Sequence, residues 1–248
     1  MLLGARQFFE RRGAPAWQNP YVTDGLVAMW DGEWNAGGGV HDANATVWVD
    51  LSGNGNDAIP GATYPRFDNN SVVFTGLSNC FWTVTNPSSS LANISQSRNY
   101  ELSLESAYDF SVTGQNAGII NLSTSATQRG YSLRFYSSKL YATFYGPQYG
   151  PYNLLSGSFA MSGKDDGLAG AYRRVVVDLY IDGTSVASMT NNFDTFGATN
   201  SMVWLGNTGA NDGVLIGHLY TSRIYNRILT AAEIAANYAI DKARFNLP

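Results

Sequence analysis

The sequence predicts an all-β protein, a sandwich of two antiparallel sheets with one short C-terminal helix and an N-terminal arm. Hydrophobic residues make up 44% of the 248 residues and charged residues only 14%, which is ample apolar area for a core. The 26 glycines and 15 tyrosines suit many short strands joined by tight turns better than a helical bundle. Alternation of apolar and polar residues recurs along the chain, and one segment near its end begins with a clear helix-capping signal.

Charge and cysteine content narrow the class further. The net charge is −4 and the pI is about 5.1, so the chain has no extended basic patch and we expect no binding to nucleic acid. Cys80 is the only cysteine, which rules out an intrachain disulfide and a thiolate-rich zinc site. No segment approaches the ~20 apolar residues that a membrane span needs, so none is expected.

Residues 1–20 stand apart from the rest of the chain. Apolar and charged residues alternate over a short helix-like stretch that ends at Gly13 and Pro15. Because an isolated helix of about eleven residues is marginal in water, it needs a surface on which to dock. That surface is either the chain's own domain or a partner protein, and a frayed terminus is the third alternative. We therefore divide the chain into an arm over residues 1–20 and a sandwich domain over residues 21–248.

Strands are expected over residues 25–30, 71–75, 131–136, 140–144, 175–181, 202–205 and 214–225. In the third of these, Tyr131, Leu133 and Phe135 fall on one face, as the alternation of a half-buried hairpin strand requires. In the last, Leu219, Ser222 and Ile224 depart from strict alternation, which predicts a β-bulge.

A turn signal and a helix signal follow two of these predicted strands. The pair Asp182-Gly183 predicts a tight hairpin turn, because glycine tolerates positive φ. Thr230 and Glu233 form a capping box, in which the hydroxyl and the carboxylate each accept an otherwise unpaired backbone amide. Ile234 and Tyr238 follow on one face, so we expect a helix packed on the sandwich edge.

Two longer motifs carry a family resemblance. Residues 48–57 read Trp-Val-Asp-Leu-Ser-Gly-Asn-Gly-Asn-Asp, and residues 217–234 read Gly-His-Leu-Tyr-Thr-Ser-Arg-Ile-Tyr-Asn-Arg-Ile-Leu-Thr-Ala-Ala-Glu-Ile. Together with the hairpin at residues 179–183 they resemble the laminin-G-like, concanavalin-A-like domains of bacterial and phage proteins. The resemblance covers residues 22–245 and implies a jelly-roll sandwich.

The opening of the domain narrows this resemblance. Residues 21–32 and 41–46 are similar to a variant found in structural proteins of phages and prophages of gut bacteria, in which the domain follows a short basic segment. The resemblance implies a component of the phage particle, located in the virion, whose arm contacts other virion proteins.

The loop at residues 50–57 is a candidate calcium site. Asp50, Ser52, Asn54 and Asn56 occupy alternate positions and Asp57 follows, so oxygen-bearing side chains could wrap Ca²⁺. The loop is not an EF-hand, because its twelfth position is glycine where a bidentate Glu is needed. The alternative is that these side chains only stabilise a tight turn.

The segment Glu101-Leu-Ser-Leu-Glu105 is a candidate catalytic pair. Some concanavalin-like glycosidases carry Glu-x-Asp-x-Glu on a strand, and here Ser103 replaces the central Asp. Carboxyls of a retaining enzyme lie about 5–5.5 Å apart, whereas positions i and i+4 of a regular strand lie about 13 Å apart. The alternative is a strand with Leu102 and Leu104 inward and both glutamates in water, and it is the one we expect.

An aromatic loop over residues 144–152 is the candidate ligand site. Exposed Tyr145, Tyr149 and Tyr152 could stack on sugar rings or anchor a protein interface. The alternative is that these rings fold back over the edge of the sandwich.

Two functional hypotheses follow. The preferred one is a non-enzymatic structural or binding module of a virion that serves decoration, a fibre or adhesion, with surface glycans as candidate ligands. The other is a retaining glycosidase, or a secreted lectin-like accessory domain, outside the cell or on a bacterial surface.

Overall fold

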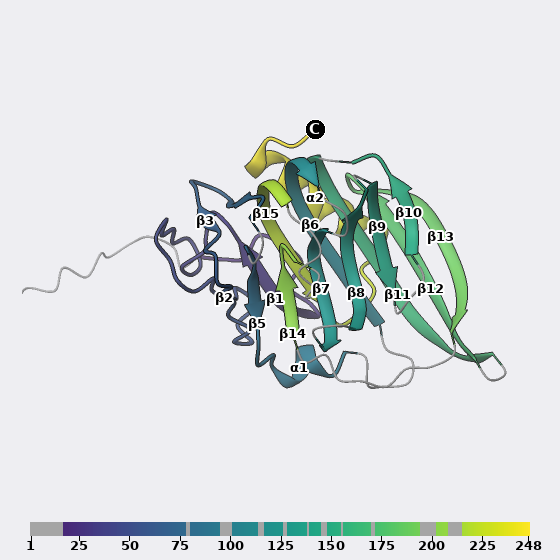
Figure 1. Ribbon diagram of the computed structural model, residues 1–248. Helices are drawn as coiled ribbons and strands as arrows, with labels where there is room; N and C mark the ends of the chain where they lie inside the picture. Colours follow the sequence, from purple (N-terminus) through teal and green to yellow (C-terminus); the bar gives the residue numbers. More distant parts are fainter. Residues whose placement is uncertain are drawn as a thin grey trace, which may run out of the picture.

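The computed structural model describes residues 17–248 except 78–79, 95–100, 114–116, 126–127, 138, 145–147, 155, 170–171, 194–201 and 208–214. Two antiparallel sheets face each other and form a sandwich (Figure 1). The predicted all-β class and two-sheet architecture are confirmed. The helix expected near the N-terminus, and most of the arm, lie outside the described residues.

The larger sheet has eight strands. Its order is β13 (Thr184–Phe193), β12 (Tyr172–Ile181), β11 (Ser156–Ala169), β6 (Glu101–Thr113), β15 (Leu215–Tyr225), β4 (Val72–Thr75) and β3 (Arg66–Phe67), and β1 (Leu26–Asp31) also pairs with β15. The register of β15 against β6 shifts between Leu219 and Thr221, which confirms the predicted bulge.

The smaller sheet has seven strands. Its order is β10 (Gln148–Tyr152), β9 (Lys139–Phe144), β8 (Gln128–Tyr136), β7 (Ala117–Ser125), β14 (Met202–Leu205), β5 (Trp82–Val84) and β2 (Ile59–Pro60). Strands β8 and β9 form the expected hairpin, whose turn places Ser137 at a φ of 48°.

The apolar core fills the space between the sheets. The predicted inward residues of β8, Tyr131, Leu133 and Phe135, are all fully buried there. Trp48 and Trp82 contact each other edge to face in the same core. Aromatic pairs of this kind contribute beyond the area they bury, about 0.5–1.5 kcal/mol each.

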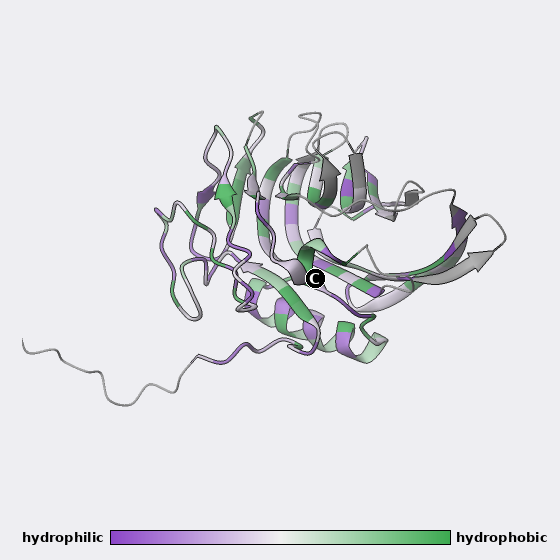
Figure 2. Ribbon diagram, turned by 90° about the horizontal axis from the view of Figure 1, so that it is seen from below, coloured by the Kyte–Doolittle hydropathy of each residue, from purple (hydrophilic) through white to green (hydrophobic). Residues whose placement is uncertain are grey.

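Helix α2 (Ala231–Phe245) lies along the outer side of the sandwich (Figure 2), and a single-turn helix α1 (Ser89–Ala92) precedes β6. The capping box is present, because Glu233 N donates to Thr230 Oγ1 at 3.2 Å and Thr230 N donates to Glu233 Oε2 at 2.8 Å. In the described part of the chain, neither helix is long and apolar enough to cross a membrane.

The chain between residues 17 and 21 runs against the domain. The Trp17 ring meets Trp34 edge to face, with 5.3 Å between the ring centroids. A β-carbon on Gly38 would come within 2.2 Å of Trp17, so this glycine makes room for the ring. Tyr21 is buried, and its hydroxyl donates to Asp241 of α2 at 2.7 Å. Trp17, which the sequence assigns to the arm, thus packs on the sandwich domain.

Candidate functional site

A row of polar side chains crosses the outer face of the seven-stranded sheet. The row consists, from strand to strand, of Thr143, Ser132, Asn121, Trp204 and Thr83, each directly opposite the next. Residues opposite one another in a sheet project from the same face. The residue that precedes each of them packs in the core, so the row faces outward. We call these five residues the polar row.

Four of the five members of the polar row are buried although they are polar, and Trp204 is half-buried. Ser132 is 1% exposed and Thr143 is 2% exposed, and the Asn121 side chain is fully buried. Among the described residues, the hydroxyls of Ser132 and Thr143 and the indole N–H of Trp204 have no hydrogen-bond partner, whereas Thr83 donates to the Val203 carbonyl. Each unpartnered buried group of this kind costs about 1–3 kcal/mol. Native folds keep few such groups, so a cluster of them on one face of a sheet calls for an explanation.

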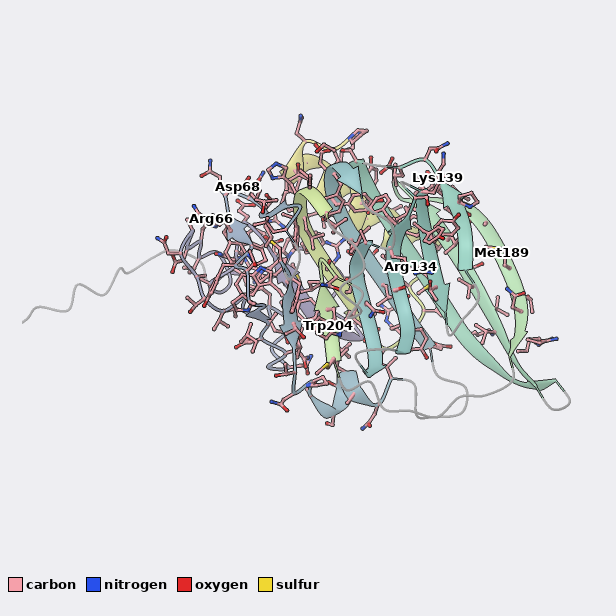
Figure 3. All side chains as sticks on the ribbon, viewed as in Figure 1. Arg66, Asp68, Arg134, Lys139, Met189 and Trp204 are labelled. Carbon is pink, nitrogen blue, oxygen red and sulfur yellow. The ribbon has the colours of Figure 1, made fainter. Side chains whose placement is uncertain are left out.

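Aromatic and basic side chains flank the polar row. Arg134 lies two residues from Ser132 on β8, directly opposite Tyr141 on β9, and is buried. At the other end, Phe81 meets Trp204 edge to face, with 4.8 Å between ring centroids. Figure 3 places Arg134 and Trp204 on the sheet nearer the viewer. Hydroxyl, amide, guanidinium and aromatic groups together can bind a ligand that offers both hydroxyl groups and ring faces.

The sequence did not identify this face. Its members come from five strands and lie between positions 83 and 204 of the chain, so no local spacing connects them. The sequence carried only a weak indication of the site, weaker than a local motif. This indication was the polar residues at the outward positions of β7, β8 and β9, together with a tryptophan on β14.

In the predicted calcium loop, Asp50 is fully engaged in hydrogen bonds. Its Oδ1 accepts from the amides of Met29 and Ser52 at 3.0 and 2.9 Å. Its Oδ2 accepts from Ser52 Oγ at 2.8 Å and from the Asn56 amide at 2.9 Å. These four bonds occupy the four lone-pair positions of a carboxylate, which leaves it little capacity for a cation.

The other members of that loop also hold the backbone. Asn54 and Asn56 each donate to the Val27 carbonyl, and Asp57 accepts from the Asp50 amide at 2.8 Å. Among the described residues, no group of three or more His, Cys, Asp or Glu side chains could hold a metal. Calcium binding stays a prediction, and these contacts favour the alternative of a tight turn that clamps β1.

The three predicted ligand-binding tyrosines have different positions. Tyr145 lies outside the described residues, and Tyr149 is described only by its backbone pairing with Ala142. Tyr152 is half-buried against the core, with its ring 5.7 Å from that of Phe159. Burial raises the pKa of the Tyr152 hydroxyl. The ring of Tyr152 therefore folds back over the sandwich edge, and binding by the other two stays untested.

The candidate catalytic pair is split between two environments. Leu102 and Leu104 point into the core as expected, and Glu101 is exposed. The expectation that both glutamates lie in water is wrong for Glu105, which is 2% exposed. Burial raises the pKa of the Glu105 carboxyl, while the Arg223 guanidinium opposes that rise. Glu105 lies on the outer face of β6, and the cover of α2, which the strand pattern of β6 does not encode, buries it.

Glu105 belongs to a buried ionic cluster between β15 and α2. Arg223 Nε donates to Glu105 Oε2 at 2.9 Å, and its two terminal nitrogens donate to the Asp241 carboxylate at 2.9 and 2.6 Å. Asn237 donates to Glu105 at 2.8 Å, and the guanidinium lies 4.1 Å from the Tyr21 ring centroid. Every partner of Glu105 belongs to this helix–sheet contact, which assigns it a structural role.

Ser71, His218 and Asp68 resemble a catalytic triad in composition but not in geometry. The Ser71 hydroxyl and the Asp68 carboxylate both contact the same ring nitrogen, His218 Nδ1, at 2.8 and 3.1 Å. A working triad places the serine on one ring nitrogen and the carboxylate on the other. The three residues therefore join the β3–β4 turn to β15.

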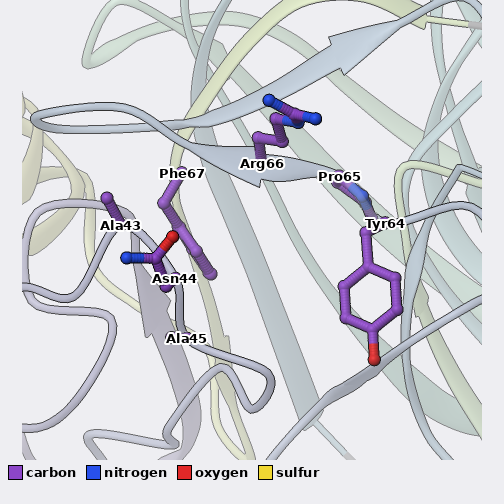
Figure 4. A pocket seen from close by; sticks show the side chains of 7 residues that line it. All are labelled: Ala43, Asn44, Ala45, Tyr64, Pro65, Arg66 and Phe67. Atoms are coloured by element: carbon purple, nitrogen blue, oxygen red, sulfur yellow. The ribbon is translucent and has the colours of Figure 1, made fainter.

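A hollow of about 490 Å³ lies between the loop at residues 43–45 and β3. Figure 4 shows Asn44 and Phe67 on one side of it and Tyr64 on the other, with Arg66 above. Tyr64 is 56% exposed. None of the residues that line this open hollow has a buried unpartnered group of the kind found in the polar row.

The fold and the outer face of the smaller sheet define a lectin-like β-sandwich. The chain matches the family model of the concanavalin A-like lectin/glucanases superfamily over residues 83–235. That match covers more than half of the chain, and the chain belongs to this superfamily. A comparison with curated protein sequences gave no match.

Solved structures share the fold at low identity. Trypanosoma rangeli sialidase is 18% identical, with a TM-score of 0.56 over 88% of this chain and 33% of the sialidase. The ligand-binding domain of botulinum neurotoxin serotype D, solved with N-acetylneuraminic acid, is 14% identical, with a TM-score of 0.56 over 90% of this chain and 52% of that one. The chain thus spans about a third to a half of these proteins, and the likeness is one of fold.

Proposed function

We propose that this domain is a non-enzymatic carbohydrate-binding module whose ligand lies on the polar row. The observation that carries the proposal is the set of unpartnered buried groups on Ser132, Thr143 and Trp204. A hydroxyl both donates and accepts a hydrogen bond, whereas an indole N–H only donates. A polyhydroxylated ligand satisfies all three groups at once.

The dimensions of the row suit a short oligosaccharide. Thr143 and Trp204 lie on β9 and β14, which are three strand spacings apart. At about 4.8 Å per spacing, the part of the row from Thr143 to Trp204 is ~14 Å long. The Trp204 ring at one end offers an apolar face for a sugar ring, and Arg134 and Tyr141 line its side.

Proteins of the same fold support this class of ligand. The botulinum neurotoxin domain was solved with N-acetylneuraminic acid, and Trypanosoma rangeli sialidase with sialic acid. Both matches are below 20% identity, so they support sugar binding as a class and no particular sugar.

The position of Glu105 supports a non-enzymatic role. Retaining hydrolysis needs two carboxyl groups about 5–5.5 Å apart that both reach the substrate. Glu105 is held by Arg223 and Asn237 beneath α2, on the sheet opposite to the polar row. A retaining glycosidase, or a lectin-like accessory domain of one, is the alternative.

The wider setting that we propose is a phage virion, where the domain would serve as a decoration, fibre or adhesion component. The resemblance of residues 21–32 and 41–46 to phage structural proteins supports it, as does the arm that precedes the domain. The arm would contact other virion proteins, and the alternative setting is the extracellular space or a bacterial surface. Electron microscopy of the particle, with antibody directed at the domain, tests this: repeated copies joined through residues 1–20 support it, and their absence counts against it.

Removal of an unpartnered hydroxyl tests the glycan site directly. In Ser132→Ala, the folded protein loses a buried group that lacks a partner, so the free energy of unfolding stays the same or rises. Glycan binding weakens about two- to twelvefold, because a ligand hydrogen bond contributes about 0.5–1.5 kcal/mol. Glycan-array screening followed by calorimetry measures both, and Ser111→Ala, at an exposed position of β6 on the other sheet, is the control. If Ser132→Ala, Thr143→Val and Trp204→Phe all leave the affinity for the glycan unchanged, the polar row is not the glycan-binding site.

Incubation with the bound glycan tests the enzyme alternative. We expect the chain to release no shortened product. Release that Glu101→Gln abolishes would replace the binding-module proposal with a glycosidase.

A further inference from the structure

The buried ionic cluster continues from α2 to β1. Arg244 donates to the Tyr21 hydroxyl and to Asp31 Oδ2, both at 2.7 Å, and the Tyr21 hydroxyl donates to Asp241. Over the described residues, the cluster then includes three carboxylates that are at most 2% exposed and two guanidiniums, those of Asp31, Glu105 and Asp241 and those of Arg223 and Arg244. Glu33 also pairs with Arg244, but its side chain is 41% exposed to water. With the five buried groups ionised, one negative charge lacks a balancing cation.

This unbalanced charge falls on Glu105. Asp241 accepts from both terminal nitrogens of Arg223, and Asp31 accepts from both terminal nitrogens of Arg244. Glu105 accepts only the Nε–H of Arg223, at 2.9 Å, from a guanidinium that it shares with Asp241. Because paired guanidinium–carboxylate bonds are the stronger arrangement, Glu105 is the least compensated of the three carboxylates.

The groups around Glu105 come from four elements. They are Arg223 and Tyr225 on β15, Asn237 and Asp241 on α2, Tyr21 on the N-terminal segment, and Ala160 directly opposite on β11. Burial raises the pKa of the Glu105 carboxyl, Arg223 opposes this rise, and Asp241 adds to it. Burial also raises the pKa of both tyrosine hydroxyls, so they stay neutral. Burial without full compensation thus favours the protonated form of Glu105.

Asn237 connects Glu105 to the N-terminal segment. Its Nδ2 donates to Glu105 Oε2 at 2.8 Å, and its Oδ1 accepts from the Val22 amide at 3.0 Å. The neighbouring Tyr21 hydroxyl donates to Asp241 at 2.7 Å. Repulsion between the carboxylates of Glu105 and Asp241 therefore acts on the two side chains of α2 that bind residues 21 and 22.

We propose that Glu105 takes up one proton from the solvent in mildly acidic solution, and that this proton strengthens the attachment of residues 21 and 22 to α2. With Glu105 neutral, the cluster contains two carboxylates and two guanidiniums, so its buried charges balance. At neutral pH the unbalanced charge is present and the attachment is weaker. The segment that joins the arm to the sandwich is thus held by a contact that responds to acid.

The direction of the pKa shift sets the sign of the pH dependence. The pKa of Glu105 is higher in the folded chain than its unfolded value of about 4.3. Its contribution to stability is therefore complete below a pH of about 4.3 and is lost as the pH rises through the folded pKa. Glu233, whose pKa is lowered, changes its contribution only below that value. Asp31, whose pKa burial also raises, contributes with the same sign as Glu105, so a variant of Glu105 is needed to separate the two.

Glu105→Gln tests the proposal, and Glu101→Gln on the same strand is the matched control. Arg223 and Asn237 both donate to one oxygen of Glu105, so the amide oxygen of glutamine can accept both bonds. From pH 8 to pH 5 we expect the midpoint of thermal unfolding of the parent chain to rise relative to Glu105→Gln by about 2 °C or more. Glu101→Gln, at an exposed position, should follow the parent chain.

Hydrogen exchange measures the attachment itself. Between pH 8 and pH 5, the protection factor of the Val22 amide should rise relative to that of the Trp48 amide, which bonds to the Ala58 carbonyl outside the cluster. The rise should be absent in Glu105→Gln. Parallel unfolding profiles of the parent chain and Glu105→Gln overturn the proposal, and so does a Val22 protection factor that is the same at both pH values.

Carbon-13 NMR of the glutamate carboxyls keeps the proposal testable if Glu105→Gln does not fold. The parent chain has five glutamates. A carboxyl whose pKa lies above the ordinary value of about 4.3, and which is still observed in Glu33→Gln and Glu101→Gln, supports the proposal. Five carboxyls that all titrate at or below that value overturn it.

Discussion

Replacement of Arg223 by methionine tests the role of the buried ionic cluster. Arg223 is fully buried and holds two carboxylates, Glu105 and Asp241, which are 2% and 0% exposed. Methionine has a similar length and fills the space, but it pairs with neither carboxylate. Two buried negative charges then lie next to each other without a counter-ion.

The expected loss follows from that geometry. Removing one partner of a buried pair destabilises a protein by about 3–5 kcal/mol, because the remaining charge is left desolvated. For a domain of this size, each kcal/mol shifts the midpoint of thermal unfolding by about 2–4 °C. We therefore expect Arg223→Met to lower the midpoint by ~6–20 °C.

Two further variants separate charge from packing. The triple variant R223M/E105Q/D241N removes both carboxylate charges and should recover about half of the loss. Arg227→Met breaks the more exposed pair with Glu233 and should lower stability by less than about 1 kcal/mol. Urea unfolding followed by circular dichroism measures all three. A loss below about 1 kcal/mol for Arg223→Met, or no recovery in the triple variant, would refute the reasoning.

Three further changes give expected outcomes. Gly38→Ala places a β-carbon 2.2 Å from Trp17, so the indole ring leaves its site beside Trp34. Its fluorescence emission then shifts to the red, and an unshifted spectrum would contradict the packing of Trp17 on Gly38. Thr230→Ala removes the capping box of α2 and lowers the free energy of unfolding by about 1 kcal/mol in urea titrations; no loss would mean that the cap is dispensable. The Arg227 guanidinium, with the Thr230 amide and hydroxyl, lowers the pKa of Glu233 to about 2. Because this pKa is lower in the folded than in the unfolded chain, the stabilisation is complete above the unfolded pKa of about 4.3 and is lost as the pH falls toward 2. In the Glu233→Gln variant, this part of the loss of stability in acid should be absent. Identical profiles of unfolding free energy against pH for the variant and the parent chain would argue against this contribution of Glu233.

Features encoded by neighbouring residues could be predicted from the sequence. The alternation of Tyr131, Leu133 and Phe135 identified a hairpin strand, because a side-chain period of two separates core from solvent. The Asp182-Gly183 turn adopts φ values of 48° and 72°, as a two-residue hairpin turn requires. The capping box at Thr230 depends on a contact across three residues.

The environment of a polar side chain was harder to predict. Glu105 has the same strand pattern as Glu101, yet one is buried and the other exposed. The difference arises from Arg223 and Asp241, which lie more than a hundred residues away in the sequence. Charge alone predicts solvent exposure, and a distant partner of opposite charge reverses that prediction.

The sequence by itself thus determined the class of the protein, several of its strands and turns, and the helix that closes it. Those features depend on the conformational preferences and hydrogen bonds of residues close together in the chain. Only the tertiary structure decided that five strands align Thr143, Ser132, Asn121, Trp204 and Thr83 in one row. Strand register is set by the fit of the whole core, because a slip of one residue would turn every side chain to the other face. A site built across strands therefore becomes visible only once the sheet is assembled.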